Sequence, residues 1–272
     1  MRCWFGWRRE GGDFTMRDNR RRNRNIGTVK QGHGQNNHLC IPGHWSTDDY
    51  RNFTERLTQY KKIARIINEH EFTFVVEDTR TDCSHACTVE DVVFMLSHIP
   101  AADYGNLRLI IFRQPKRKEE ILSPVWGRLR YFYHFEGVEQ PAVVLEAVPN
   151  KSHLKYSKGM PLDVRNEFDR LKKDGHVFIA DKRGYTSKLT QETVRATQLY
   201  RTLLHEFGHY VEYRQFVENP GSEFSDMDEV ARSSYYFDSI PSAEKEKFAH
   251  AYADRLRDAL LLKGIIPFSR RH

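Results

Sequence analysis

The sequence predicts an α+β fold in which a mixed α/β portion leads into a helical C-terminal part. Short runs rich in β-branched and aromatic residues recur between positions 72 and 180, as expected for strands. Two longer segments, 191–215 and 241–262, carry apolar residues at helical spacing instead. With 272 residues, the chain can bury a sizeable core without disulfides.

Residues 1–45 are predicted to form a basic, flexible arm in front of a domain of residues 46–272. The first 30 residues contain eight Arg and one Lys against three acidic residues, so they carry the net charge of +6, and residues 31–272 sum to zero. Arginines near tryptophans can bind nucleic acid weakly through phosphate contacts and stacking, here through Arg20, Arg21, Arg22 and Arg24. The alternative is a disordered arm without a partner.

The α/β part, residues 46–189, is expected to open with a helix. Ser46 can cap a helix that reaches Ile67, because apolar residues alternate by three and four positions along it. A strand is predicted at 72–77, and a short helix from Thr88 with Asp91 at the capping-box position.

The rest of this part is predicted to alternate strands with one helix. Strands are expected at 107–112, 129–135 and 143–148 because these runs are rich in β-branched and aromatic residues. Pro161 is expected to open a helix that runs to Leu171 and ends at Gly175, followed by a short strand at 176–180.

The helical part, residues 190–272, begins with a helix predicted over 191–215. Thr190 can cap it, Glu192 lies in its first turn, and apolar residues recur at helical spacing. Gly208 is unfavourable by about 1 kcal/mol relative to Ala inside a helix. Its presence predicts that another segment packs closely against this point.

This helix carries HEFGH at positions 205–209, the minimal zinc-binding and water-activating unit of a metallopeptidase. His205 and His209 lie four residues apart, so both imidazoles can reach one ion from the same helix face. Glu206 projects about 100° away from His205, where it can act as a general base without being a ligand. Zinc tolerates such a site when a third protein ligand completes it.

The third ligand has to come from further along the chain. Glu212 and Gln215 occupy the places where a metzincin has Gly and His. The best downstream segment is 241–262, an amphipathic helix with Ser242 as its expected N-cap and apolar residues at every fourth position.

HEFGH followed about forty residues later by EKFAHAYA resembles the zincins whose third ligand is a glutamate. The chain is particularly similar to anthrax lethal factor and to the ImmA/IrrE-like metallopeptidases over its last third. The resemblance implies His205 and His209 as zinc ligands, Glu206 as general base and Glu246 as third ligand. Glu244 and His250 remain alternatives, because the family often has Glu where this chain has His250 and its spacing from the proline favours Glu244.

The same resemblance implies further features of the site. It implies a zincin-like fold, with a twisted sheet above the active-site helix and a substrate that pairs with an edge strand, either 143–148 or 176–180. It also implies a tyrosine that stabilises the tetrahedral intermediate, for which the sequence offers Tyr235 and Tyr236.

The function expected from these features is a zinc-dependent endopeptidase that hydrolyses peptide bonds of a protein or peptide substrate through a metal-activated water. Two alternatives are a nucleic-acid-associated protein, including a protease acting on DNA-bound proteins, and an inactive zincin-fold binding module. No signal peptide or transmembrane segment is evident, so a cytoplasmic protein without membrane contact is expected. A toxin or effector would have to leave the cell by a non-classical route.

The cysteines raise a second metal hypothesis. Cys83, His85 and Cys87 lie close in sequence, and Cys40 lies near His38 and His44. The spacing departs from the paired Cys-x-x-Cys clips of standard zinc fingers and ribbons, which disfavours a structural zinc.

Overall fold

The computed structural model describes residues 7–9, 55–122, 124–218 and 227–272. The described residues from 57 onward and the strand at 7–9 belong to one compact unit. The predicted arm, with Arg20, Arg21, Arg22 and Arg24, and the start of the predicted helix at 46 lie outside the described residues.

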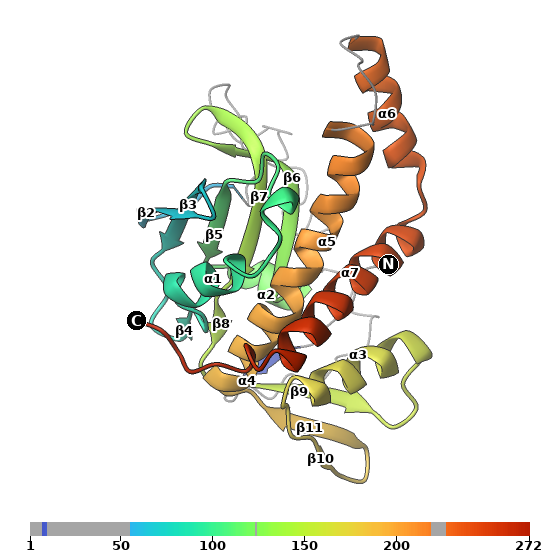
Figure 1. The fold of residues 1–272 in the computed structure, drawn as a ribbon. Coiled ribbons are helices and arrows are strands. Elements are labelled where there is room, and N and C mark those ends of the chain that lie inside the picture. The colour runs from blue at the N-terminus through green and yellow to red at the C-terminus, as the bar shows by residue number, and fades with distance from the viewer. Residues whose placement is uncertain (1–6, 10–54, 123, 219–226) are drawn as a thin grey trace, which may run out of the picture. The chain divides into compact units, whose positions relative to one another are not determined.

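A five-stranded mixed sheet forms the centre of the compact unit (Figure 1). β3 pairs in parallel with β5, and β5 with β7, while β2 and β6 pair antiparallel at the two edges. The observed α+β class with a mixed sheet and a helical C-terminal part agrees with the prediction. In spatial order the strands are β2 (Tyr60–Ile67), β3 (His70–Glu77), β5 (Leu109–Arg113), β7 (Val138–Glu146) and β6 (Gly127–Phe135).

The main core lies between this sheet and the helices. Phe72, Ile110 and Val143 contribute strand side chains to the same buried cluster as Leu203 and Phe207 of the helix that carries the HEFGH motif. Helix α1 (Val89–Leu96) packs into this cluster, and its Thr88 and Asp91 form the predicted capping box. Burial of so many large apolar side chains fixes that helix rigidly beneath the sheet.

A second sheet has the order β1-β9-β11-β10. Its inner face packs Leu154 against Leu171 of α3, around which further aromatic rings gather. The elements are β1 (Trp7–Arg9), β9 (Ser152–Ser157), α3 (Leu162–Lys173), β10 (Ile179–Ala180) and β11 (Gly184–Lys188). Three small elements complete the α/β part, namely β4 (Cys83–Ser84), α2 (Arg117–Leu122) and β8 (Val148–Pro149).

The predicted helix over 191–215 is present but not uniform. It consists of α4 (Gln191–Thr197), a π-helical turn (Gln198–Thr202), α5 (Leu203–Tyr213) and a second π-helical turn (Arg214–Glu218). Thr190 caps it as predicted, by accepting a hydrogen bond from the backbone N–H of Thr193. Two helices follow, α6 (Met227–Ser239), which was not predicted, and α7 (Ser242–Leu262), in which Pro241 instead of Ser242 takes the N-cap position.

The helix predicted to reach Ile67 is wrong over its C-terminal part. Residues 60–67 form strand β2, which pairs along its whole length with β3. The tight turn between them places Asn68 at φ 48° and Glu69 at φ 65°, as a type I′ hairpin turn requires. The turn residues Asn68 and Glu69 lack the glycine that usually marks such a turn. The apolar residues of 60–67 fit the period of a helix as well as that of a strand.

The remaining predictions hold with shifted ends. Strands occur at three of the predicted places, as β3, β5 and β6, and the predicted strand 143–148 is divided between β7 and β8. The predicted strand 176–180 contracts to Ile179–Ala180, whereas β9 and β11 were missed because their runs are short and polar. Within the described part of the chain, no helix has the length and apolar character needed to span a membrane.

Candidate metal centre

The candidate centre lies where α5 crosses α7 (Figure 1). Gly208 allows this crossing, because a Cβ there would lie 2.8 Å from Cα and 2.9 Å from the carbonyl oxygen of Ala249. No side chain fits at those distances. The predicted close approach at Gly208 is therefore confirmed, and its partner is α7.

The crossing brings three donor side chains together. Nε2 of His205 lies 3.1 Å from Nε2 of His209. One carboxylate oxygen of Glu246 lies 3.3 Å from Nε2 of His205, and the other lies 3.6 Å from Nε2 of His209. Three ligands held tetrahedrally at about 2.0–2.1 Å from zinc would lie about 3.3 Å from one another. The donor atoms of the three residues lie within 4.8 Å of one another, so one metal ion could bind all three.

The charges of these groups favour the same arrangement. Burial would raise the pKa of Glu246, but hydrogen bonds from His205 and His209 hold it far below its ordinary value. Burial would lower the pKa of His209, but the hydrogen bond to Glu246 and the charges of Glu206, Glu246 and Glu212 together raise it. Two imidazoles facing an ionised carboxylate form a donor set that suits zinc.

Glu206 is held by the edge strand of the sheet. The backbone N–H of Leu129 in β6 donates a hydrogen bond of 2.6 Å to Oε2 of Glu206. Glu206 is half-buried on the same helical turn as His205, and it is not part of the donor set. This places a carboxylate beside the candidate ligands, as the motif predicts.

The edge strand beside the centre is β6, not either of the predicted ones. Strand β7, which contains 143–146, is paired on both sides, with β5 and β6, so it has no free edge. Strand β10, within 176–180, is an edge of the other sheet. A run of β-branched residues suits a central strand as well as an edge strand, and only the strand pairing shows which position a strand takes.

A β-bulge in β6 brings an unpredicted tyrosine to the centre. The β6–β7 register shifts between Arg130 and Tyr133, opposite Pro141, which has no N–H to donate to the ladder. Tyr131 lies in this bulge with its ring 4.5 Å from that of Tyr213. Burial raises the pKa of Tyr131, and the nearby carboxylates of Glu206, Glu212 and Glu246 raise it further. Pro141, between the predicted strands 129–135 and 143–148, was the available signal for this bulge.

Tyr235 and Tyr236 lie on α6 and are largely solvent-exposed, by 79% and 58%. The ring of Tyr236 contacts Phe216 at 5.7 Å. Among the described residues, no hydrogen bond links either phenol to His205, His209 or Glu246. The structure thus does not bring the predicted tyrosines to the three donor groups.

The two alternative ligands differ in position. Glu244 is exposed in the first turn of α7 and is not part of the donor group. The ring of His250 packs 4.4 Å from that of His205, but Nε2 of His250 accepts a hydrogen bond of 3.0 Å from Arg170. Burial, with the electrostatic influence of the neighbouring His205 and Arg170, lowers the pKa of His250 to about 3. His250 is therefore a neutral ring whose Nε2 lone pair is engaged by an arginine.

The first π-helical turn, Gln198–Thr202, contacts the edge strand β6 just before α5 begins. Its first residue, Gln198, donates from one amide nitrogen to the carbonyl oxygens of Trp126, at 2.9 Å, and Glu146, at 2.8 Å. Gly127 permits the close approach, because a Cβ there would lie 3.0 Å from the Thr202 side chain. Single π-helical turns inside α-helices occur frequently at functional sites.

Buried ion pairs hold α3 against the same helices. Arg201 pairs with Glu167 and Asp174 at 2.7 Å each, and Arg257 of α7 pairs with Asp174 at 3.1 Å. Removing one member of such a network leaves a buried charge without its partner. The network therefore supports the position of α7, and with it the position of Glu246.

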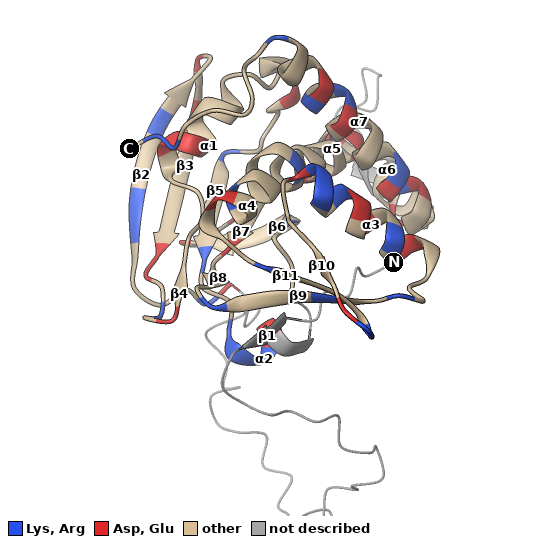
Figure 2. Ribbon diagram, turned by 90° about the horizontal axis from the view of Figure 1, so that it is seen from below, with Lys and Arg blue, Asp and Glu red and all other residues tan. Residues whose placement is uncertain are grey.

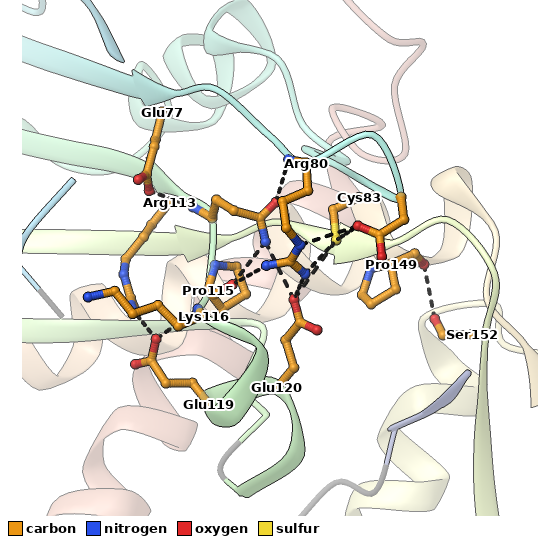
Figure 3. Close-up of polar contacts among 12 residues, drawn as sticks. Glu77, Arg80, Cys83, Arg113, Pro115, Lys116, Glu119, Glu120, Pro149 and Ser152 are labelled. Atoms are coloured by element: carbon orange, nitrogen blue, oxygen red, sulfur yellow. Dashed lines mark hydrogen bonds and ion pairs between the residues drawn. The ribbon is translucent and has the colours of Figure 1, made fainter. Parts of the chain in front are cut away.

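The cysteine hypothesis finds no support among the described residues. Cys83 lies against the guanidinium of Arg80, which also pairs with Glu120 (Figure 3). His85 bonds a backbone oxygen at 2.8 Å, and Cys87 donates to Gln198 at 3.5 Å. The three side chains thus face separate partners, while Cys40, His38 and His44 lie outside the described residues.

No protein-family model, curated protein or solved structure matches this chain.

Proposed function

We propose that the chain is a zinc-dependent endopeptidase with a zincin-like fold, in which His205, His209 and Glu246 hold zinc and Glu206 is the general base. The observation that carries the proposal is the group of His205, His209 and Glu246, whose donor atoms lie within 4.8 Å of one another, beside the carboxylate of Glu206. If the two histidines were only part of a polar stripe on a surface helix, there would be no reason for Glu246 of a second helix to lie beside both of them.

The protein's own groups then have separate tasks. Zinc held here would polarise the scissile carbonyl and make a water molecule more acidic. Glu206 accepts the proton of that water and later delivers it to the leaving amine. The hydrogen bond from Leu129 fixes one carboxylate oxygen of Glu206, which leaves the other free for proton transfer.

Substrate would bind as an extended strand along β6. This strand is an edge of the mixed sheet and packs beside α5, and the backbone N–H of its Leu129 already faces Glu206. An edge strand offers unpaired N–H and C=O groups to a peptide backbone. The phenol of Tyr131 takes the role that the sequence assigned to Tyr235 or Tyr236, by donating to the developing oxyanion.

Metal content, measured with cleavage of an unstructured protein such as casein, tests the proposal. We expect one equivalent of zinc and metal-dependent cleavage in the parent protein. Glu206→Gln should keep zinc and lose turnover, because only the base is removed. Glu246→Gln should lose zinc, whereas its matched control Glu244→Gln and the variant His250→Asn should retain it.

Two results would overturn the assignment. Undiminished cleavage by Glu206→Gln excludes Glu206 as the base, and unchanged zinc content in Glu246→Gln excludes Glu246 as a ligand. A parent protein that binds zinc through the three residues but cleaves nothing favours the inactive binding module instead.

A further inference from the structure

The second sheet and the turns that border its strands concentrate positive charge. Segments 151–158 and 181–188 contain six Lys or Arg residues against one acidic residue, whereas residues 31–272 as a whole sum to zero. Figure 2 shows blue positions along β9 and at the turn between β10 and β11. All six cationic side chains are exposed, and they are Lys151, Lys155, Lys158, Lys182, Arg183 and Lys188.

Strand register aligns basic positions across this sheet. His153 of β9 lies opposite Lys188 of β11 on one side and opposite the position of Arg8 in β1 on the other. Lys155, two residues further along β9, lies on the same face and opposite Thr186. Lys155 and Lys188 therefore lie on one face of the sheet, on neighbouring strands.

The protein provides little negative charge to balance the row. In the described part of the chain, no ion pair joins any of the six cations to a carboxylate. The one acidic residue, Asp181, instead accepts hydrogen bonds from the backbone N–H groups of Arg183, at 2.6 Å, and Gly184, at 2.7 Å. The lysines therefore remain available to an anionic partner.

We propose that this basic face, formed by the six cations and His153, binds the phosphate backbone of nucleic acid without sequence preference. The seven residue steps from Lys151 to Lys158 cover about 23 Å at about 3.3 Å per residue. One strand of a duplex presents about seven phosphates over that length, at about 3.4 Å each. Thr186, on the same face, adds a hydroxyl donor of the kind that contacts phosphate.

Arginine content favours nucleic acid over other anions. Strand β1 pairs with β9 and is followed in the chain by the arginine-rich segment with Arg20, Arg21, Arg22 and Arg24. The planar guanidinium group matches phosphate with two parallel hydrogen bonds.

An anionic lipid surface is the competing partner. Val177 and Ile179, next to and within β10, are exposed by 76% and 72%, and aliphatic side chains beside lysines also suit a membrane interface. The test must therefore separate the two.

Fluorescence anisotropy of the full chain with labelled 20-nucleotide single-stranded and duplex oligonucleotides tests the proposal, at several salt concentrations. Lys155→Glu/Lys188→Glu is compared with Lys61→Glu/Lys263→Glu, which changes two exposed lysines on β2 and after α7 and makes the same change in net charge. We expect the basic-face variant to bind at least about tenfold more weakly and its salt slope to fall by about two, with little effect of the control. Thermal unfolding checks that both variants fold.

Three outcomes would overturn the proposal. The parent protein could fail to bind either oligonucleotide, or both double variants could lose affinity equally, which would indicate net charge alone. Binding to vesicles of phosphatidylserine and phosphatidylcholine, without binding to oligonucleotides, would assign the face to lipid. Since cleavage is not a readout here, these results are independent of the peptidase assignment.

Discussion

The backbone N–H of Leu129 and Oε2 of Glu206 are joined by a hydrogen bond of 2.6 Å. This bond connects the edge strand of the sheet to the carboxylate of the HEFGH motif, which is not part of the group formed by His205, His209 and Glu246. It sets how far the carboxylate can reach, because one of its oxygens is committed to the strand.

Shortening the side chain of Glu206 keeps its charge but changes the position of the carboxylate, so it tests whether the position matters. In Glu206→Asp the carboxylate withdraws by one methylene, so it cannot keep both the contact with Leu129 and its place at the centre. We expect zinc content to be unchanged and kcat to fall by about 10²-fold or more, since misplacement by about 1 Å has that effect. Kinetics and elemental analysis on the same sample check this, and near-normal kcat would show that the strand contact is irrelevant.

Removing the Tyr131 hydroxyl should affect the reaction but not the fold. Tyr131→Phe keeps the ring contacts with Tyr213 and Phe237. Loss of one oxyanion donor typically lowers kcat by about 10²–10³-fold, so we expect a fall of that order with KM and zinc content unchanged. Tyr236→Phe is the matched control and should behave like the parent protein. A fall in kcat for Tyr236→Phe but not for Tyr131→Phe would instead assign the oxyanion donor to α6.

Gly208 should be intolerant of even one added methyl group. Alanine is favoured over glycine in a helix by about 1 kcal/mol, but a Cβ here meets the backbone of Ala249 at 2.8 Å. We expect Gly208→Ala to lower the free energy of unfolding by about 1–3 kcal/mol and to weaken zinc binding, because α5 and α7 must move apart. Gly159→Ala, where nothing lies within 4 Å, is the control in denaturant unfolding. A Gly208→Ala protein as stable as the parent would contradict the packing argument.

The buried pair of Asp91 and Arg195 should make stability depend on pH. Two hydrogen bonds of 2.8 Å join them. Burial would raise the pKa of Asp91, but the hydrogen bonds and charge of Arg195, together with hydrogen bonds from the backbone N–H groups of Arg271 and Thr88, lower it. The stabilisation is therefore fully present above the unfolded pKa of about 3.9 and is lost as pH falls through the lower folded value.

Asp91→Asn should accordingly reduce the free energy of unfolding by about 3–5 kcal/mol at pH 7, since it leaves Arg195 buried without its partner. The difference from the parent should shrink below about pH 4. Urea unfolding at both pH values measures it, with the exposed Asp254→Asn as control. A difference that stays constant with pH would rule out the ion pair as its source.

Much of the site could be predicted because it depends on local periodicity. His205, Glu206 and His209 occupy one helix, and the spacing of a helix fixes their mutual positions. Thr88 and Thr190 likewise cap their helices as predicted, because a cap involves residues only three positions apart.

Other features depend on contacts between distant segments. Residues 60–67 are a strand because β3 pairs with them, although their apolar spacing also fits a helix. The edge strand is β6 because β7 lies between β5 and β6, and this order cannot be predicted from the sequences of the strands.

The sequence by itself determined the HEFGH helix, the need for a downstream donor, and the α+β class. Only the tertiary structure decided that Glu246 faces the two histidines while Arg170 engages His250, and that Tyr131 approaches from the bulge. It also aligned His153 with Lys188 across the second sheet. The physical reason is that helix geometry is set within a few residues, whereas strand order and helix crossing follow from which apolar surfaces are buried together.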